Sequence, residues 1–353
     1  MLVLSNDEVA RLLSIEECMS ALEGMYRDLA DERALMSPRV DNMAPNSHPG
    51  AYYAFKHMGG TLPSQRVQAL RINSDVITHP LVAGKPRRVK QPLANGRWVG
   101  LVLLFSTETG ALLAMFPDGV MQRMRVGAAN GLALKALGRE DVRTLALIGS
   151  GWQAGAQLAA ALAARPFREV RVYSPRRETR EAFVAESRKR YKADIIAVDS
   201  ADACVDGADV IAAATSSMVR VIEPRWIKPG MHVSCIKTQE IDAEVLARCE
   251  RIVLHNRRQA KQINNAMKEI GQAAEEASEG WRKGATSRYP DLSDLLTGRA
   301  QGRQSAKEVT CFANNVGTGL QFAAAGAMVL RKAREQSIGT ELPDDWFSED
   351  VHP

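Results

Sequence analysis

The feature that most constrains the fold is the segment LALIGSGWQAGAQLAAALAARPFREVRVYS, residues 145–174. It combines an apolar strand, a glycine turn, a helix and a second strand within about 30 residues, and its glycines follow a G-x-G-x-x-A pattern. The first glycine permits a tight turn, the second lets the backbone approach a pyrophosphate, and the alanine keeps the helix close to the sheet. The helix start also offers free N–H groups and a positive dipole end. The pattern predicts a dinucleotide site made of Gly149, Ser150, Gly151, Trp152, Gln153 and Ala154.

The end of the second strand bears on the choice between the two nicotinamide cofactors. In NAD binders an Asp or Glu there accepts hydrogen bonds from the ribose 2′-hydroxyl. Here Ser174 stands at that point, and Arg176 and Arg177 follow. A hydroxyl with one or two guanidinium groups suits a 2′-phosphate, which an acid would repel. We therefore expect NADP(H), with NAD(H) as the alternative; the arginines would otherwise be a solvated helix start paired with Glu178 and Glu181.

From Val142 onward, strand patterns alternate with helical patterns. The runs TLALIG, EVRVYS, ADIIAVD, ADVIAAAT, MHVSCI and RIVLHN are apolar, and helical segments separate them. Such alternation predicts an α/β fold with a doubly wound parallel sheet of the Rossmann type and right-handed crossovers.

The chain before this domain has a different texture. Between residues 37 and 118, the β-rich runs AYYAF, VQALRI, WVGLVLLFS and ALLAMF are separated by turn signals, which predicts a mostly antiparallel sheet. Apolar spacing predicts a helix over 7–31, broken near Ser14, and another over about 121–137. A Gly- and Ala-rich helix over roughly 314–335 is expected to pack closely against the N-terminal domain.

Composition is that of an ordinary soluble protein. The 353 residues are 45% hydrophobic and 25% charged, which suits two domains with a core in each. The net charge of +5 comes from basic residues interleaved with acids, so we expect no nucleic-acid partner. No long apolar run and no basic leader stand out, so we expect a cytoplasmic protein without a membrane span. Five cysteines without a CxxC pair and six histidines without ligand spacing predict reduced thiols and no metal site.

Segments along most of the chain resemble the ornithine cyclodeaminase and mu-crystallin family. They are SPRV (37–40), LVLLFSTETGALLAMFPDG (101–119), RVGAANGLALKAL (125–137), LALIGSGWQA (145–154), GADVIAAATSS (207–217), IKPGMHVSCI (227–236) and VGTGLQFAAAGAMV (316–329). The resemblance implies a homodimer whose α+β substrate-binding and dimerisation domain is built from both chain ends, here 1–124 and 314–353. A Rossmann NAD(P)-binding domain would then span 125–313. The implied reactions are hydride transfer at the α-carbon of amino acids or cyclic imines, or redox-neutral cyclodeamination.

The resemblance also implies roles in the substrate site. Arg39 in SPRV and Arg125 in RVGAANG match arginines that bind the substrate carboxylate, for which a planar guanidinium is well suited. The family lysine that handles the proton at the imine nitrogen corresponds to Arg71, which is a poor acid because its pKa stays above about 12. Lys56 is the nearby candidate for this role, with a surface position as its alternative. Thr215, in the matching segment GADVIAAATSS, is assigned to the cofactor site.

Two departures from the family pattern bear on the substrate. Cyclodeaminases carry an aspartate in the loop after the strand that resembles GMHVSCI, whereas this chain has Lys237 there and no aspartate before Asp242. The closing segment likewise offers Gln321 and no acid. Both departures weigh against ornithine as the substrate. The missing aspartate, together with Ser174, Arg176 and Arg177, also favours net reduction.

Together these residues predict an NAD(P)H-dependent oxidoreductase that reduces a small α-imino acid or cyclic ketimine to an amino acid, or runs the reverse reaction. Arg39, Arg125 and Arg71 would hold the carboxylate, while Lys56 or water protonates the nitrogen. One alternative is a cyclodeaminase of ornithine or a related diamino acid with recycled NAD. Another is a non-catalytic protein that binds a small ligand with its nucleotide, since Arg71 replaces the family lysine. The basic segment 81–98 is expected to be an inserted surface hairpin or a lid.

Overall fold

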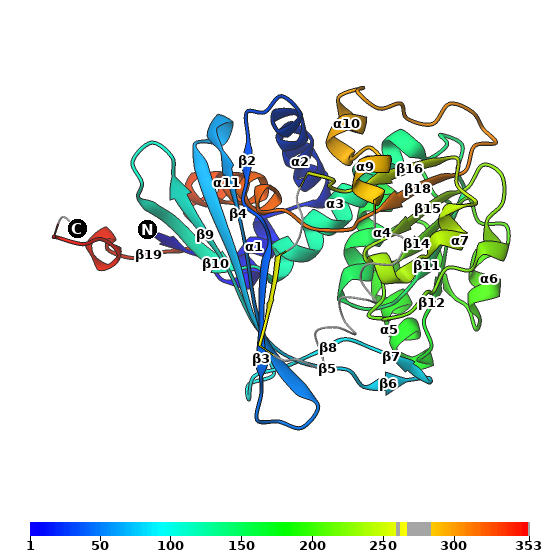
Figure 1. Ribbon diagram of the computed structural model, residues 1–353, viewed down its shortest axis with the longest axis horizontal. Helices are drawn as coiled ribbons and strands as arrows, with labels where there is room; N and C mark the ends of the chain where they lie inside the picture. Colours follow the sequence, from blue (N-terminus) through cyan, green and yellow to red (C-terminus); the bar gives the residue numbers. More distant parts are fainter. Residues whose placement is uncertain (259–261, 267–283, 352–353) are drawn as a thin grey trace.

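The computed structural model describes residues 1–258, 262–266 and 284–351. The chain forms two bodies, each built on one large sheet, and the helix α3 (Gly119–Leu137) runs from one to the other (Figure 1). Both chain ends belong to the first body, where β1 (Leu2–Val3) pairs with β19 (Thr340–Glu341). Within the described residues, no helix has the length and apolar character that crossing a membrane requires.

The first body contains a ten-stranded sheet that is mostly antiparallel, as expected. Its remaining strands are β2 (Leu35–Met36), β3 (Val40–Pro45), β4 (Ala51–Leu62), β5 (Val67–Thr78), β8 (Val89–Gln91), β9 (Val99–Ser106), β10 (Leu112–Pro117) and β17 (Gln262–Asn265). The main path is β17-β3-β4-β5-β9-β10-β1-β19. Burial alternates strictly along β5, so one face of the sheet is covered and the other is partly open to solvent.

Helices α1 (Asn6–Leu12), α2 (Ile15–Ala30) and α11 (Gly319–Glu335) complete this body. The predicted break near Ser14 is confirmed, because the Ser14 hydroxyl caps α2 by accepting the Glu17 N–H at 3.2 Å. The helix α11 packs on the covered face of the sheet, and a Cβ on Gly319 would lie 2.1 Å from the backbone of β4. It starts later than residue 314, the predicted start, because the preceding residue, Thr318, is an extended N-cap.

The second body is a parallel sheet in the order β13-β12-β11-β14-β15-β18-β16. Its strands are β11 (Thr144–Ile148), β12 (Glu169–Tyr173), β13 (Asp194–Ala197), β14 (Val210–Ala213), β15 (His232–Cys235), β16 (Arg251–Leu254) and β18 (Thr310–Ala313). Its helices are α4 (Trp152–Ala164), α5 (Arg177–Arg188), α6 (Ala201–Val205), α7 (Ala243–Leu246), α9 (Ala285–Arg288) and α10 (Leu292–Leu296). The strand order reverses between β11 and β14, which confirms a doubly wound Rossmann domain with its switch point there.

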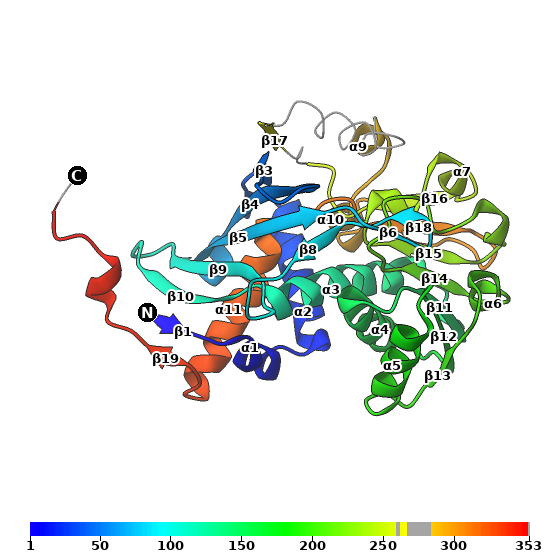
Figure 2. The same ribbon diagram turned by 90° about the horizontal axis from the view of Figure 1, so that it is seen from below.

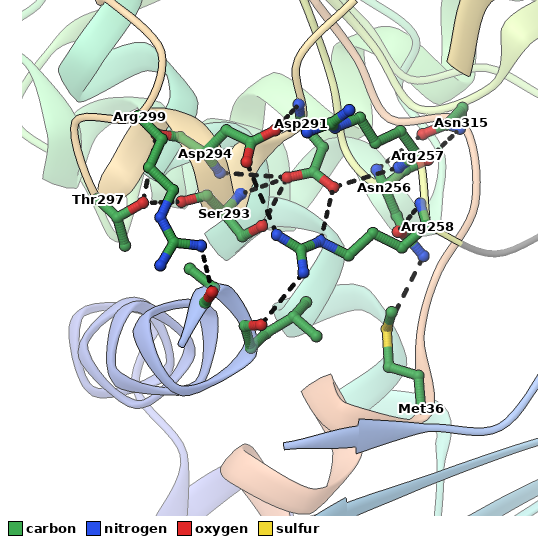
Figure 3. A network of polar contacts seen from close by, with 12 residues as sticks. Met36, Asn256, Arg257, Arg258, Asp291, Ser293, Asp294, Thr297, Arg299 and Asn315 are labelled. Atoms are coloured by element: carbon green, nitrogen blue, oxygen red, sulfur yellow. Dashed lines mark hydrogen bonds and ion pairs between the residues drawn. The ribbon is translucent and has the colours of Figure 1, made fainter. Parts of the chain in front are cut away.

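A polar network fastens the second body to α2 (Figure 3). The guanidinium of Arg258 lies 3.6 Å from Asp291 and 3.7 Å from Asp294, and it donates to the carbonyl of Leu29 in α2 at 3.3 Å. Asp291 is buried and also caps α10 by accepting the backbone N–H groups of Ser293 and Asp294. The carboxylates of Asp291 and Asp294 therefore position both the start of α10 and the segment after β16 that contains Arg258.

Two short segments cross between the bodies. The strand β17 lies within residues 125–313 of the sequence but pairs in parallel with β3 of the first sheet. In the other direction, the segment 81–98 contains a hairpin of β6 (Leu81–Val82) and β7 (Lys85–Pro86), which reaches the Rossmann body in both views (Figures 1 and 2). One segment of each body thus contacts the other body, and the division at residues 125 and 313 stays a prediction.

Candidate functional site

The glycine turn after β11 has the geometry of a dinucleotide cradle. Gly149 has a φ of +123°, and a Cβ on it would lie 2.2 Å from the carbonyl oxygen of Ala214. Gly151 begins α4 without a side-chain cap, and a Cβ on it would meet no atom within 4 Å. Ala154 is fully buried where α4 packs on the sheet. The helix start therefore combines unused N–H groups with open space, and it fits a pyrophosphate.

Two further residues of the turn contact α3. Trp152 is 54% exposed, and the guanidinium carbon of Arg123 lies 4.1 Å from the centre of its ring. Gln153 donates from its side-chain amide to Gln122 at 2.6 Å. These contacts fix the start of α4 relative to the helix that carries Arg125.

Two arginines follow the end of β12, and one of them has no carboxylate partner among the described residues. Ser174 is buried, and its hydroxyl lies 2.8 Å from that of Ser150 in the glycine turn. Arg176 is exposed, and its guanidinium forms no ion pair within the described part of the chain. Arg177 instead pairs with Glu181 at 2.7 Å on the surface of α5. Arg177 thus occupies the solvated position that was the alternative for both arginines, whereas Arg176 remains available to an anion.

Strands β4 and β5 place four polar side chains on the covered face of the first sheet. Lys56 lies on β4, and Arg71, Asn73 and Asp75 lie on β5, with Asn73 directly opposite Lys56. Each of these residues is at most 5% exposed. Buried charges need a partner or a ligand, and this concentration of buried polar groups makes the face the candidate substrate site.

Arg71 is held in place by Asp118, which precedes α3. The guanidinium lies 2.7 Å from the Asp118 carboxylate and also bonds Asn73. A Cβ on Gly100 would lie 2.1 Å from Asp118, so the glycine makes room for this contact. Burial lowers the pKa of Arg71, and Asp118 opposes that effect. The residue that orients Arg71 is therefore Asp118.

Arg125 faces the same space from α3. One of its terminal nitrogens donates to Gln321 at 3.0 Å, whereas its buried Nε has no hydrogen-bond partner among the residues that the structure describes. The guanidinium carbons of Arg125 and Arg71 lie 5.4 and 5.6 Å from the centre of the Phe322 ring. Burial, and then the charge of Arg71, lowers the pKa of Arg125 from its ordinary value to about 9, so it stays protonated at neutral pH. Two cations and an unused donor point to an anionic ligand.

Arg39, the residue directly before β3, joins Arg71 and Arg125 in this group of cations. Its Nε and one terminal nitrogen bind the two oxygens of Asp41 at 2.7 and 2.9 Å, and its side chain is 23% exposed. Its charge helps to lower the pKa of Lys56, Arg71 and Arg125, so the four cations lie within electrostatic reach of one another. A substrate carboxylate at Arg39 would compete with Asp41.

Lys56 is buried, so its alternative as a surface lysine is wrong. Its Nζ lies 3.0 Å from Asp75, whose other oxygen lies 2.9 Å from Lys90. Burial lowers the pKa of Lys56 from 10.5 to about 6; Arg88 lowers it further and Asp75 opposes both. An amine with this pKa can give and take a proton near neutral pH.

The loop after β15 carries a lysine and a buried carboxylate. Lys237 donates to the carbonyl of Ser217 at 2.5 Å, and burial lowers its pKa from 10.5 to about 8. Glu240 accepts the backbone N–H and the hydroxyl of Thr215 at 2.6 and 2.8 Å. Thr215 therefore lies at the switch point, with both donors engaged by Glu240. Asp242 caps α7 by accepting the backbone N–H of Val245.

Sequence reasoning missed the residues that position the arginines. Besides Asp118, they include Gly317, where a Cβ would lie 2.2 Å from the guanidinium of Arg125. Behind Gln321, the hydroxyl of Tyr26 accepts from the Gln321 amide at 3.2 Å and lies 2.6 Å from Nε2 of His255. Only the pair Asp-Gly directly before a predicted helix gave a local signal for Asp118. The other contacts join residues far apart in the chain.

Comparisons with known proteins identify the family of this chain and its fold. The profile of the ornithine cyclodeaminase/mu-crystallin family matches residues 1–337. An alanine dehydrogenase of Archaeoglobus fulgidus is 28% identical over 97% of this chain and 98% of its own length.

Two solved structures share the fold. The Δ1-pyrroline-2-carboxylate reductase of Thermococcus litoralis, in complex with NADH and L-proline, is 22% identical, with a TM-score of 0.78 over 97% of this chain and 100% of that one. A dimeric archaeal alanine dehydrogenase with bound NAD is 24% identical, with a TM-score of 0.74 over 97% of this chain and 99% of that one. Because the family profile covers nearly the whole sequence, the chain belongs to the ornithine cyclodeaminase/mu-crystallin family.

Proposed function

We propose that this protein is an NAD(P)H-dependent reductase that converts a small α-imino acid or cyclic ketimine into an amino acid. The observation that carries the proposal is the convergence of Arg39, Arg71 and Arg125 on one space beside the buried amine of Lys56. The similar proteins that act on alanine and on pyrroline-2-carboxylate support the same class of reaction.

The arginines would bind the substrate carboxylate. Arg125 offers its unused Nε, and Arg71 is already aligned by Asp118. A carboxylate between these guanidinium groups would offset the mutual repulsion that lowers the pKa of Arg125. Binding through two planar forks also fixes the direction of the imine carbon next to the carboxylate.

Lys56 would deliver the proton to the imine nitrogen. In the reducing direction, the protonated amine gives its proton to the nitrogen while the imine carbon receives a hydride, so the C=N bond becomes an amine. The reduced nicotinamide supplies that hydride when it is bound. Asp75 keeps part of the Lys56 population protonated because it opposes the effect of burial on the Lys56 pKa. In the reverse direction, neutral Lys56 takes the proton back.

The turn residues Gly149 to Ala154 would hold the cofactor pyrophosphate, and Ser174 and Arg176 would face the adenosine ribose. With no acid at the end of β12, we propose NADP(H) as the preferred cofactor and NAD(H) as the alternative. Thr215 would contribute to this proposed site if a bound cofactor replaced its hydrogen bonds to Glu240. Arg177 would contribute if it gave up its ion pair with Glu181.

The protein is further proposed to be a homodimer whose substrate domain is formed by residues 1–124 and 314–353. The solvent-facing side of its sheet carries the half-buried apolar residues Leu70, Ile72, Leu101, Leu103 and Phe105. A second copy covering this face would bury them, and the similar archaeal alanine dehydrogenase is a dimer.

The proposed activity is tested by following NADPH oxidation in the presence of pyrroline-2-carboxylate, piperideine-2-carboxylate, or pyruvate with ammonia. We expect turnover with at least one of these imines and none with ornithine alone. Formation of proline from ornithine with no reduction of any imine would instead establish a cyclodeaminase. Nucleotide binding without either activity would establish a binding protein.

A further inference from the structure

The hairpin β6–β7 carries an arginine into the cofactor domain. The backbone N–H of Arg88 donates to Ser216 at 3.2 Å, and the N–H of Met218 donates to Pro86 at 3.1 Å. Arg87 consequently forms an antiparallel bridge with Ser217, in the loop that follows β14 at the switch point. The insertion is therefore docked on the Rossmann domain by its backbone, at the edge where a dinucleotide binds.

The side chain of Arg87 has an environment unlike that of a surface arginine. The residue is only 9% exposed, yet its guanidinium forms no ion pair and no hydrogen bond within the described part of the chain. Burial lowers the pKa of Arg87, and the next contribution is the positive charge of Arg176 at the end of β12. Tyr173 and Glu240 are also close enough to act on it, and Glu240 is already engaged by Thr215.

Among the described residues, Arg87 and Arg176 are thus two guanidinium groups without bonded carboxylates, and they lie within electrostatic reach of each other at the edge where a dinucleotide binds. One comes from the first body and one from the Rossmann body. Two positive charges that lie close together in a partly buried site repel each other and destabilise the structure. A dianionic phosphate between them would offset this repulsion. A phosphate monoester carries a charge of about −1.5 to −2 at pH 7 and accepts several charge-assisted hydrogen bonds.

We propose that Arg87 and Arg176 together bind the 2′-phosphate of NADP(H), with the Ser174 hydroxyl beside them. This rests on the proposed nicotinamide-dependent function and extends it, because it assigns the choice of cofactor to a hairpin of the substrate domain. Arg177, which sequence reasoning placed in the same role, is engaged by Glu181.

The proposal is tested by titrating the full-length protein with NADPH, NADH and 2′,5′-ADP, using nicotinamide fluorescence and calorimetry. Each of the variants Arg87→Ala and Arg176→Ala is expected to raise the Kd for NADPH and 2′,5′-ADP about tenfold or more, and to change the Kd for NADH less than about twofold. The control is Arg97→Ala, an exposed arginine of the same segment 81–98. This control should bind all three ligands as the wild type does.

The outcomes separate this proposal from the proposed function. A wild-type protein that prefers NADH, or an Arg87→Ala variant that keeps its affinity for NADPH, would overturn the role of Arg87. An equal loss of NADH and NADPH would also overturn it, since Arg87 would then bind a part common to both. If the wild type bound neither nucleotide, the proposed function itself would fail. Melting temperatures of all variants show whether a loss of binding comes from unfolding.

Discussion

Lys56 and Asp75 lie on neighbouring strands with 3.0 Å between the amine and the carboxylate, and both are buried. Burial brings the pKa of Lys56 to about 6, and Asp75 keeps it from falling further. Two opposing effects thus set the pKa of Lys56, and the proposed role of Lys56 as proton donor depends on their balance. This arrangement determines how the rate should depend on pH.

The first prediction concerns that pH dependence. Protonated Lys56 is the acid for reduction, so kcat/KM should fall as the pH rises through about 6, and the reverse oxidation should gain over the same range. Lys56→Met should lose about 100-fold or more in kcat and lose this limb of the profile. Asp75→Asn should move the limb to lower pH, because it removes the charge that raises the Lys56 pKa. A Lys56→Met enzyme with the wild-type profile would remove Lys56 from the reaction.

The second prediction concerns Gln321, which accepts a hydrogen bond from Arg125 and donates one to Tyr26. Gln321→Glu would place a carboxylate beside Arg125 and neutralise part of the substrate site. We expect KM for the imino acid to rise about tenfold or more, with the Kd for NADPH unchanged. Gln336→Glu, on an exposed position after the same helix, is the matched control. An unchanged KM in steady-state assays would contradict the assignment of Arg125 to the substrate carboxylate.

The third prediction separates two glycines of one turn. Gly149→Ala should lower the stability by about 1–3 kcal/mol or more, because φ is positive and the Cβ would strike Ala214. Gly151→Val should leave thermal unfolding nearly unchanged, because the space beside it is open, but should raise the Kd for NADPH about tenfold or more. Calorimetric unfolding and fluorescence titration measure the two effects. Normal cofactor affinity in Gly151→Val would place the pyrophosphate elsewhere.

The fourth prediction concerns assembly. Phe105 lies half-buried on the solvent-facing side of β9, so Phe105→Glu should place a charge in the proposed dimer interface. Light scattering should give about twice the chain mass of 38.6 kDa for the wild type and a lower mass for the variant. Phe347→Glu, an exposed position in the C-terminal segment, should leave the mass unchanged. A monomeric wild type would rule out this interface.

Features that depend on neighbours in the chain could be predicted from the sequence. The turn at Gly149 and Gly151 follows from local steric rules, and the parallel sheet follows from alternating strand and helix patterns. The break between α1 and α2 was visible because Ser14 and Glu17 form a local capping box. In each case the deciding contacts span only a few residues.

Features that depend on contacts between residues far apart in the chain could not be predicted from the sequence. The burial of Lys56 follows from the register of β4 on β5 and from α11 packed over both strands. Asp118 reaches Arg71 only because Gly100, on a third strand, leaves room. The sequence alone did not indicate that Arg177 would pair with Glu181 while the adjacent Arg176 would have no ion pair among the described residues.

The sequence by itself thus determined a Rossmann domain with a dinucleotide turn and the residue types that suit an anionic substrate. Short-range sterics and hydrophobic periodicity are sufficient for those conclusions. Only the tertiary structure decided which cations share one space, which of them are paired with a carboxylate, and that Arg87 crosses from one body to the loop after β14 of the other, within electrostatic reach of Arg176. Charge interactions depend on distance in space and on burial, and neither quantity can be obtained from separation along the chain.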